Sequence, residues 1–153
     1  MRIFSGIALA LLCGTLALSS AASADTPVTS NPKGKIAVEF LDMVFNQKKV
    51  KEGFAKYVGS YYKQHNPFAA DGAQPAIDFL APYLEKNTGY RYDFKHVYVD
   101  GDIVVVHSHV KRDDNDRGSA VVDIFRLEKG KVVEHWDVIQ PIPEKSANSN
   151  TMF

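Results

Sequence analysis

The side chains best suited to chemistry lie in one stretch near the C-terminus, from Val121 to Gln140. Its two halves are rich in Val, Ile and Phe, and the segment 128–131 between them contains a glycine, which predicts two β-strands joined by a tight turn. Asp123, His135 and Asp137 interrupt these apolar runs. Because side chains alternate along a strand, His135 and Asp137 must share one face.

The form of the turn decides which residue lies opposite Asp123. A bulged turn at Gly130 pairs Asp123 with His135, whereas a plain two-residue turn pairs it with Trp136. We expect the bulged form, because it gathers the three polar side chains on one face.

These three residues are the candidates for acid/base catalysis. If Asp137 faces the inside of the domain, it is partly desolvated and can accept a proton; the alternative is a solvated carboxylate on an open sheet face. His135 could hydrogen-bond Asp123 and share proton transfer, or it could be a structural histidine. Asp123 could orient His135 or contact substrate, or it could be a buried polar partner without chemistry.

Other polar residues could line a binding pocket. His107 and His109 share a strand face, and together with His135 or Asp137 their ligand types would suit zinc. Alternating histidines also occur on ordinary strands, so we expect them to line the pocket and expect no metal and no cofactor.

A second polar group follows Tyr62, which is itself a candidate ligand contact. Gln64, His65 and Asn66 could place hydrogen-bond donors at the mouth of the pocket, and Pro67 holds Asn66 in an extended conformation. The alternative is a loop stabilised by its own polar side chains.

Three segments resemble the SnoaL-like branch of the nuclear-transport-factor-2-like superfamily: the run from Gly130 to Glu144, the run from Tyr62 to Pro67, and His107-Ser108-His109. The resemblance covers roughly residues 35–145. It implies a cone-shaped α+β domain, in which a curved antiparallel sheet wraps around helices and leaves a pocket at its open end. The polyketide cyclases of this branch close a ring by an intramolecular aldol reaction, with acid/base residues and no metal. The resemblance therefore implies a small, apolar, carbonyl-containing ligand.

The hydrophobic pattern predicts three helices before the sheet. The first runs from Asn31-Pro32 to about residue 46, the second covers about residues 50–58, and the third follows Asp71. Pro82 lies inside the third helix and should kink it or end it early.

From Tyr90 onward the apolar period changes to two. Asp100-Gly101 predicts a turn, 103–110 is a strongly β-branched strand, and a charged turn leads into the hairpin at 121–140. Three helices followed by four antiparallel strands give an α+β domain. The polar segment 146–153 has little to pack and should fray.

Residues 1–24 have the pattern of a secretory signal peptide. An apolar run at 7–18 follows a basic residue, and Ala22-Ser23-Ala24 predicts cleavage before Asp25. The apolar run is shorter than the ~20 residues that a membrane span needs, so we expect no stable membrane anchor. Cys13, the only cysteine, leaves with the signal. The expected product is one periplasmic or secreted domain, residues 25–153.

The composition bears on partners. The segment 25–153 contains 17 basic residues, the 18 of the whole chain less Arg2, against 18 acidic ones. This near-neutral balance does not favour nucleic acid binding. An apolar strip on the outer sheet face predicts a homodimer; it consists of Val122, Ile124, Trp136 and Val138. A binding protein without catalysis, or a stress-related protein, would use the same fold.

Overall fold

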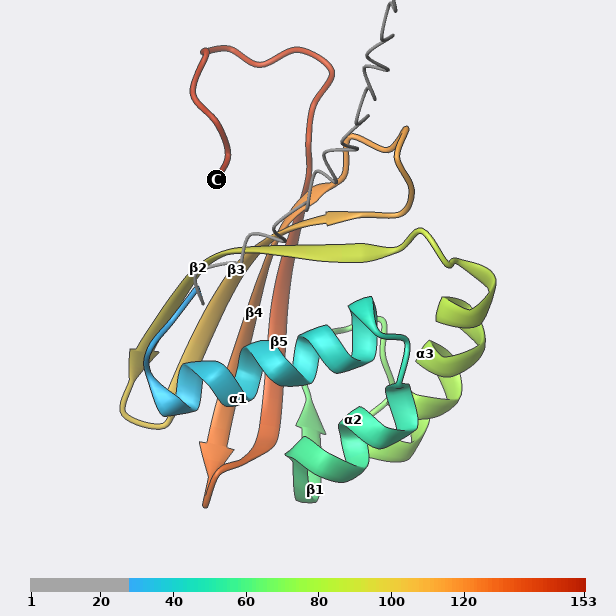
Figure 1. Ribbon diagram of the computed structural model, residues 1–153, viewed down its shortest axis with the longest axis vertical. Helices are drawn as coiled ribbons and strands as arrows, with labels where there is room; N and C mark the ends of the chain where they lie inside the picture. Colours follow the sequence, from blue (N-terminus) through green and yellow to red (C-terminus); the bar gives the residue numbers. More distant parts are fainter. Residues whose placement is uncertain (1–27) are drawn as a thin grey trace, which may run out of the picture.

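Figure 1 shows the computed structural model, which describes residues 28–153. The predicted signal peptide, residues 1–24, lies outside the described residues. The described elements are α1 (Pro32–Leu41), the π-helix η1 (Asp42–Asn46), α2 (Val50–Tyr57), β1 (Val58–Gln64), α3 (Ala73–Lys86), β2 (Arg91–Asp100), β3 (Ile103–Lys111), β4 (Ser119–Glu128) and β5 (Lys131–Pro141). None of the helices from residue 28 onward is long and apolar enough to span a bilayer.

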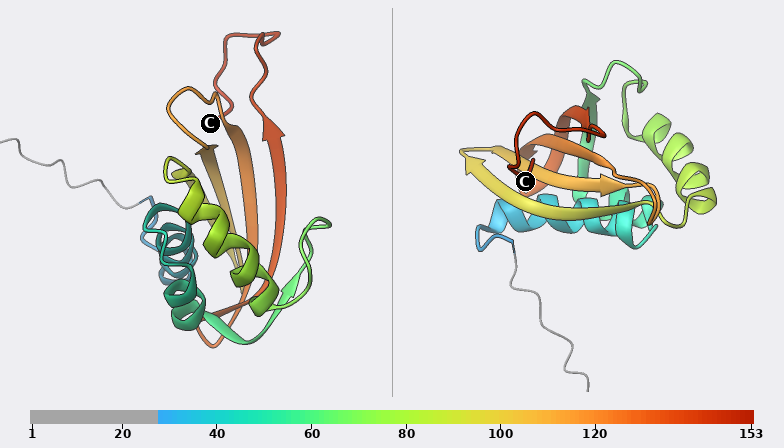
Figure 2. Two further views of the ribbon diagram at one scale, coloured as in Figure 1. Left: turned by 90° about the vertical axis from the view of Figure 1, so that its right-hand side faces the viewer. Right: turned by 90° about the horizontal axis from the view of Figure 1, so that it is seen from above.

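The helices lie on one face of a curved five-stranded sheet, as both views in Figure 2 show. The strand order is β1-β5-β4-β3-β2; β1 runs parallel to β5, and the other neighbours are antiparallel. This confirms the α+β cone. The sheet is mixed, however, because β1 adds a fifth strand that the sequence pattern did not predict. The sequence of β1 lacks an apolar alternation, because it contains Ser60, Lys63 and Gln64. The segment is a strand because it pairs with β5.

Aromatic side chains fill the space between helices and sheet. Phe40 of α1 lies 5.2 Å from Phe54 of α2 and 5.8 Å from Phe125 of β4, measured between ring centroids. All three rings are almost fully buried. Each such side chain contributes about 1.5–3 kcal/mol through burial, so this cluster fixes α1 and α2 against the middle of the sheet.

The first helix begins as predicted. The Asn31 side chain accepts hydrogen bonds from the backbone N–H groups of Lys33 and Gly34, and Pro32 is the first helical residue. The helical stripe continues to Asn46, but its last five residues form the π-helix η1.

The third helix passes through Pro82 and ends at Lys86. Of the two expected effects of Pro82, a kink or an early end, the early end does not occur. Pro82 is exposed, which lets water satisfy the carbonyl that loses its hydrogen bond. The Asn87 backbone and side chain both donate to the Tyr83 carbonyl and close the helix.

The β4–β5 hairpin differs from both predicted registers. Lys129 and Gly130 have positive φ angles of 50° and 75° and form a two-residue turn. One unpaired residue, Val133, makes a bulge farther along β5. The combined shift places Asp123 opposite Asp137, so the expected pairing with His135 is wrong.

Candidate functional site

A cavity of about 360 Å³ lies between the inner face of the sheet and the helices. Its walls are mostly apolar and aromatic. The polar side chains among them are Tyr62, Gln64, Asn66, Tyr92, Asp123, His135 and Asp137. This confirms that the three polar residues of the hairpin share the inner face, although their register was predicted incorrectly.

Asn66 holds the carboxylate of Asp137. Its Nδ2 lies 2.8 Å from each oxygen of Asp137, and its Oδ1 accepts a hydrogen bond from the Phe68 backbone N–H. That backbone bond fixes the orientation of the amide, because only the oxygen can accept. The nitrogen of Asn66 must therefore face Asp137.

The tautomer of His135 follows from similar reasoning. Gln64 Oε1 accepts from the Asn66 backbone N–H at 3.0 Å and lies 3.1 Å from His135 Nδ1. An oxygen that accepts from both partners requires a proton on Nδ1. His135 Nε2 then lies 3.0 Å from Asp123 Oδ1, a contact that needs one more proton, shared between the ring and the carboxyl group.

Asp123 is the most buried ionisable group of this cluster, with 3% of its surface exposed. Burial raises its pKa, although the hydrogen bond from His135 acts in the opposite direction. Within the described part of the chain its Oδ2 has no hydrogen-bond partner. The cluster therefore contains a buried oxygen that can still accept a hydrogen bond.

Two tyrosines add neutral donors to the cavity wall. Burial, and next the negative charge of Asp123, raises the pKa of the hydroxyls of Tyr62 and Tyr92. Both hydroxyls therefore keep their protons at physiological pH. Sequence reasoning missed Tyr92, although the alternation of Tyr90, Tyr92 and Phe94 indicated a strand with one aromatic face.

The structure brings together six of the nine predicted site residues: Tyr62, Gln64, Asn66, Asp123, His135 and Asp137. His65 is not among them, and its expected place in the pocket is wrong. Its ring stacks on Trp136 at 4.4 Å and contacts Glu134 at 2.7 Å, on the outer face. The hydrogen bond from His65 is the main cause that lowers the pKa of Glu134. Because Gln64 lies in a strand, its neighbour His65 points to the opposite face.

His107 and His109 also lie on the outer face, so their expected place in the pocket is wrong. They pair with Val122 and Ala120 of β4, while the alternate residues of β3 face the core. The C-terminal Phe153 stacks on both rings, at 5.5 Å and 4.6 Å. Phe153 therefore packs on the sheet, whereas residues 146–151 are exposed.

Asp123, His135 and Asp137 could in principle hold a metal ion, since one ligand atom of each lies within 4.8 Å of the others. His135 Nε2 already contacts Asp123 Oδ1, so an ion bound through that nitrogen would displace the proton that the two groups share. The absence of a metal stays a prediction.

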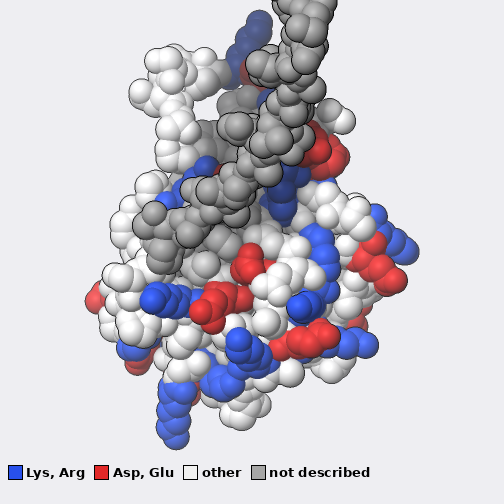
Figure 3. Space-filling view, in the orientation of Figure 1, with Lys and Arg blue, Asp and Glu red and all other residues white. Residues whose placement is uncertain are grey.

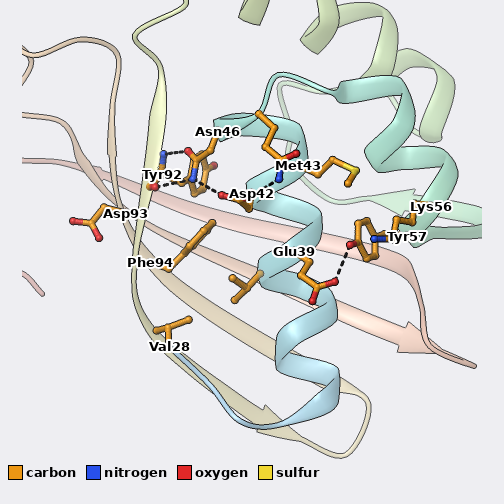
Figure 4. Close-up of a pocket in the computed structure, with 12 residues that line it drawn as sticks. Val28, Glu39, Asp42, Met43, Asn46, Lys56, Tyr57, Tyr92, Asp93 and Phe94 are labelled. Carbon is orange, nitrogen blue, oxygen red and sulfur yellow. Dashed lines mark hydrogen bonds between the residues drawn. The ribbon is translucent and has the colours of Figure 1, made fainter. Parts of the chain in front are cut away.

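A larger open groove of about 950 Å³ lies between α1, η1 and β2 (Figure 4). Most of its polar side chains bond one another. Asn46 bonds the Asp42 side chain and the Tyr92 backbone, and Tyr57 donates to Glu39. These groups are not free to bind a ligand, so the smaller cavity is the candidate site.

The profile of the SnoaL-like domain matches residues 37–135. This chain belongs to the SnoaL-like family. The match ends two residues before Asp137, so the family profile covers all the predicted site residues except that carboxylate. A search of curated protein sequences finds no significant match.

Solved structures share the SnoaL-like fold at low sequence identity. A candidate polyketide cyclase from Acidithiobacillus ferrooxidans is 14% identical, with a TM-score of 0.60 over 72% of this chain and 89% of that one. A candidate isomerase of the SnoaL-like family from Agrobacterium tumefaciens is 15% identical, with a TM-score of 0.60 over 71% and 97%. An NTF2-like protein of unknown function from Cytophaga hutchinsonii is 15% identical, with a TM-score of 0.57 over 76% and 95%. These likenesses show the fold.

Proposed function

We propose that this SnoaL-like protein is an acid/base enzyme that acts, without a metal, on a small and largely apolar carbonyl compound. The reaction would be of the aldol, cyclase or isomerase type. The observation that carries the proposal is the Asp137 carboxylate, oriented by Asn66, beside the proton-sharing Asp123–His135 pair in an apolar cavity.

Asp137 is the proposed general base. It would remove a proton from the carbon next to the substrate carbonyl, and the electron pair of the broken C–H bond would move onto the carbonyl oxygen. The shared proton of Asp123 and His135, or a neutral tyrosine hydroxyl, would stabilise the resulting enolate oxygen. The enolate carbon would then attack a second carbonyl or be protonated at a new position.

One observation favours the alternative of a protein that only binds a ligand. Both oxygens of Asp137 already accept from Asn66, and such a bond can hold a carboxylate in a purely structural role. A binding or stress-related protein needs the same cavity and no base.

Asp137→Asn tests the proposal, because it removes the base and keeps the shape. The assay is the exchange of α-protons for deuterium, followed by NMR, in a panel of small ketones incubated in D₂O. We expect exchange to fall by ~10²- to 10⁴-fold in the variant. Glu134→Gln is the control, because Glu134 lies on the same strand but faces outward. Equal exchange in the Asp137 variant, or no exchange above buffer while the ketones still bind, would favour the binding protein.

We further propose that the protein is exported and forms a homodimer. The pattern of residues 1–24 supports export, and exported protein should begin at Asp25 by mass spectrometry. The outer sheet face supports a dimer: Val138 is 62% exposed and neighbours Trp136. Light scattering at micromolar concentration tests the dimer, and a monomer would contradict it.

A further inference from the structure

The charge of the cavity can be counted from its hydrogen bonds. The Asp123–His135 pair holds one proton on Nδ1 and one between Nε2 and Oδ1, so the pair is neutral wherever the second proton lies. Asp137 accepts from Asn66 through both oxygens, as a carboxylate does. The cluster therefore carries one net negative charge.

No positive side chain of the described residues balances that charge within the cavity. Among residues 28–153, which the structure describes, no Lys or Arg lines the cavity. Lys48 lies near its helical wall, but it donates to the backbone carbonyls of Phe45 and Tyr90. The molecular surface differs: on the face seen in Figure 3, basic and acidic side chains are intermixed. The uncompensated charge is thus a property of the cavity.

A second observation also indicates a ligand with donor groups. Asp123 is one of the residues that line the cavity, and its Oδ2 is buried and has no partner in the described chain. A buried carboxylate oxygen without a partner is destabilising unless a bound molecule donates to it. Asp123 and Asp137 lie opposite each other on adjacent strands, so one donor group could reach both.

The rest of the cavity wall is apolar and aromatic, which suits a ligand that has an apolar part and a positive charge. Aromatic rings surround the polar cluster: Phe40, Phe45, Phe54, Phe68, Phe79 and Phe125. The faces of such rings attract ammonium groups. The volume of about 360 Å³, at ~30 Å³ for each water-sized group, holds about a dozen heavy atoms.

We propose that the cavity binds an organic monocation, an ammonium group on an apolar body of about a dozen heavy atoms. The ammonium lies between Asp137 and the free oxygen of Asp123, and the apolar body packs against the aromatic walls. The assignment goes beyond the proposed function, because it concerns the charge of the ligand and requires no turnover.

Three probes of nearly equal size test the assignment: 4-phenylbutylamine as the cation, 4-phenylbutanol as the neutral molecule and 4-phenylbutyrate as the anion. Calorimetry at neutral pH should show the amine binding at least ~10-fold more tightly than the alcohol, and the anion most weakly. Asp137→Asn should remove the preference for the amine and leave alcohol binding unchanged. Glu134→Gln, on the outer face, should keep the preference.

Several results would overturn the assignment: an alcohol or an anion that binds as tightly as the amine, no binding of the amine, or an unchanged preference in the Asp137 variant. Zinc or magnesium chloride that displaces the amine and stabilises the protein more would assign the cluster to a metal ion instead. Asp137→Ser provides a second variant if the first does not fold, with the same expected loss of preference, because it removes the same charge. Intact amine selectivity without ketone exchange would refute only the proposed enzyme activity.

Discussion

Replacing Asp123 by Asn should stabilise the protein while it disables the proton-sharing pair. Asp123 is buried, and one of its oxygens has no partner in the described chain. Asn has the same shape, and its amide can still bond His135 Nε2 through a donor or an acceptor. The variant therefore removes a buried carboxyl group with one unpartnered oxygen, without opening a cavity.

The size of the effect follows from the unpartnered oxygen. A buried oxygen without a partner costs about 1–3 kcal/mol of stability, and the amide that replaces the carboxyl group would recover part of that cost. We therefore expect the free energy of unfolding to rise by about 1 kcal/mol at neutral pH. In a domain of this length the gain raises the melting temperature by roughly 3–5 °C.

The gain should depend on pH in a defined direction. Burial raises the pKa of Asp123 above its usual 3.8, so between the two values the folded protein binds more protons than the unfolded chain. The stability contributed by this group is fully present below pH 3.8 and is lost as pH rises through the raised pKa. The advantage of the variant should therefore be smallest near pH 4 and grow as pH rises.

Urea unfolding between pH 4 and 8, followed by the fluorescence of Trp136, measures the difference. Glu134→Gln is a matched control of opposite sign, because hydrogen bonds from His65 and Arg126 lower the pKa of Glu134. Glu134→Gln should be less stable than the wild type by a constant amount above pH 4.5, and this difference should shrink as pH falls below 4.5. If the Asp123 variant is less stable than the wild type at every pH, or if the difference is flat, the carboxylate is stabilised by its pairing and the reasoning fails.

Three further changes test the fold. Phe125 is 1% exposed and its ring packs between Phe40 and His135. Phe125→Ala leaves a void there, and urea unfolding should show that the free energy of unfolding falls by about 3–5 kcal/mol. Gly118→Ala should cost about 1–3 kcal/mol in the same assay, because the residue has φ +85° and the new Cβ would lie 2.3 Å from a backbone oxygen. Burial, and then the charge of His96, lowers the pKa of His107 below 6.5. The stability that His107 contributes is present above pH 6.5 and is lost as pH falls through the lowered pKa. The stability of His107→Asn should therefore depend less on pH below 6.5.

The sequence alone determined the helices, most of the strands and the shared face of the polar residues. These features depend on local periodicity: a helical stripe before residue 46, alternation from Tyr90, and the two-residue spacing of His135 and Asp137. A period of two places both side chains on one face whatever lies across the sheet.

Tertiary structure decided the features that depend on partners distant in sequence. The polar strand β1 becomes a strand only by pairing with β5, and that pairing turns Gln64 and Asn66 inward and His65 outward. The bulge at Val133 sets the cross-strand partner of Asp123. The faces of His107 and His109 were equally ambiguous, because alternation gives two faces and only helix packing selects the inner one. The tautomer of His135 depends on a glutamine 71 residues away, which no local pattern encodes.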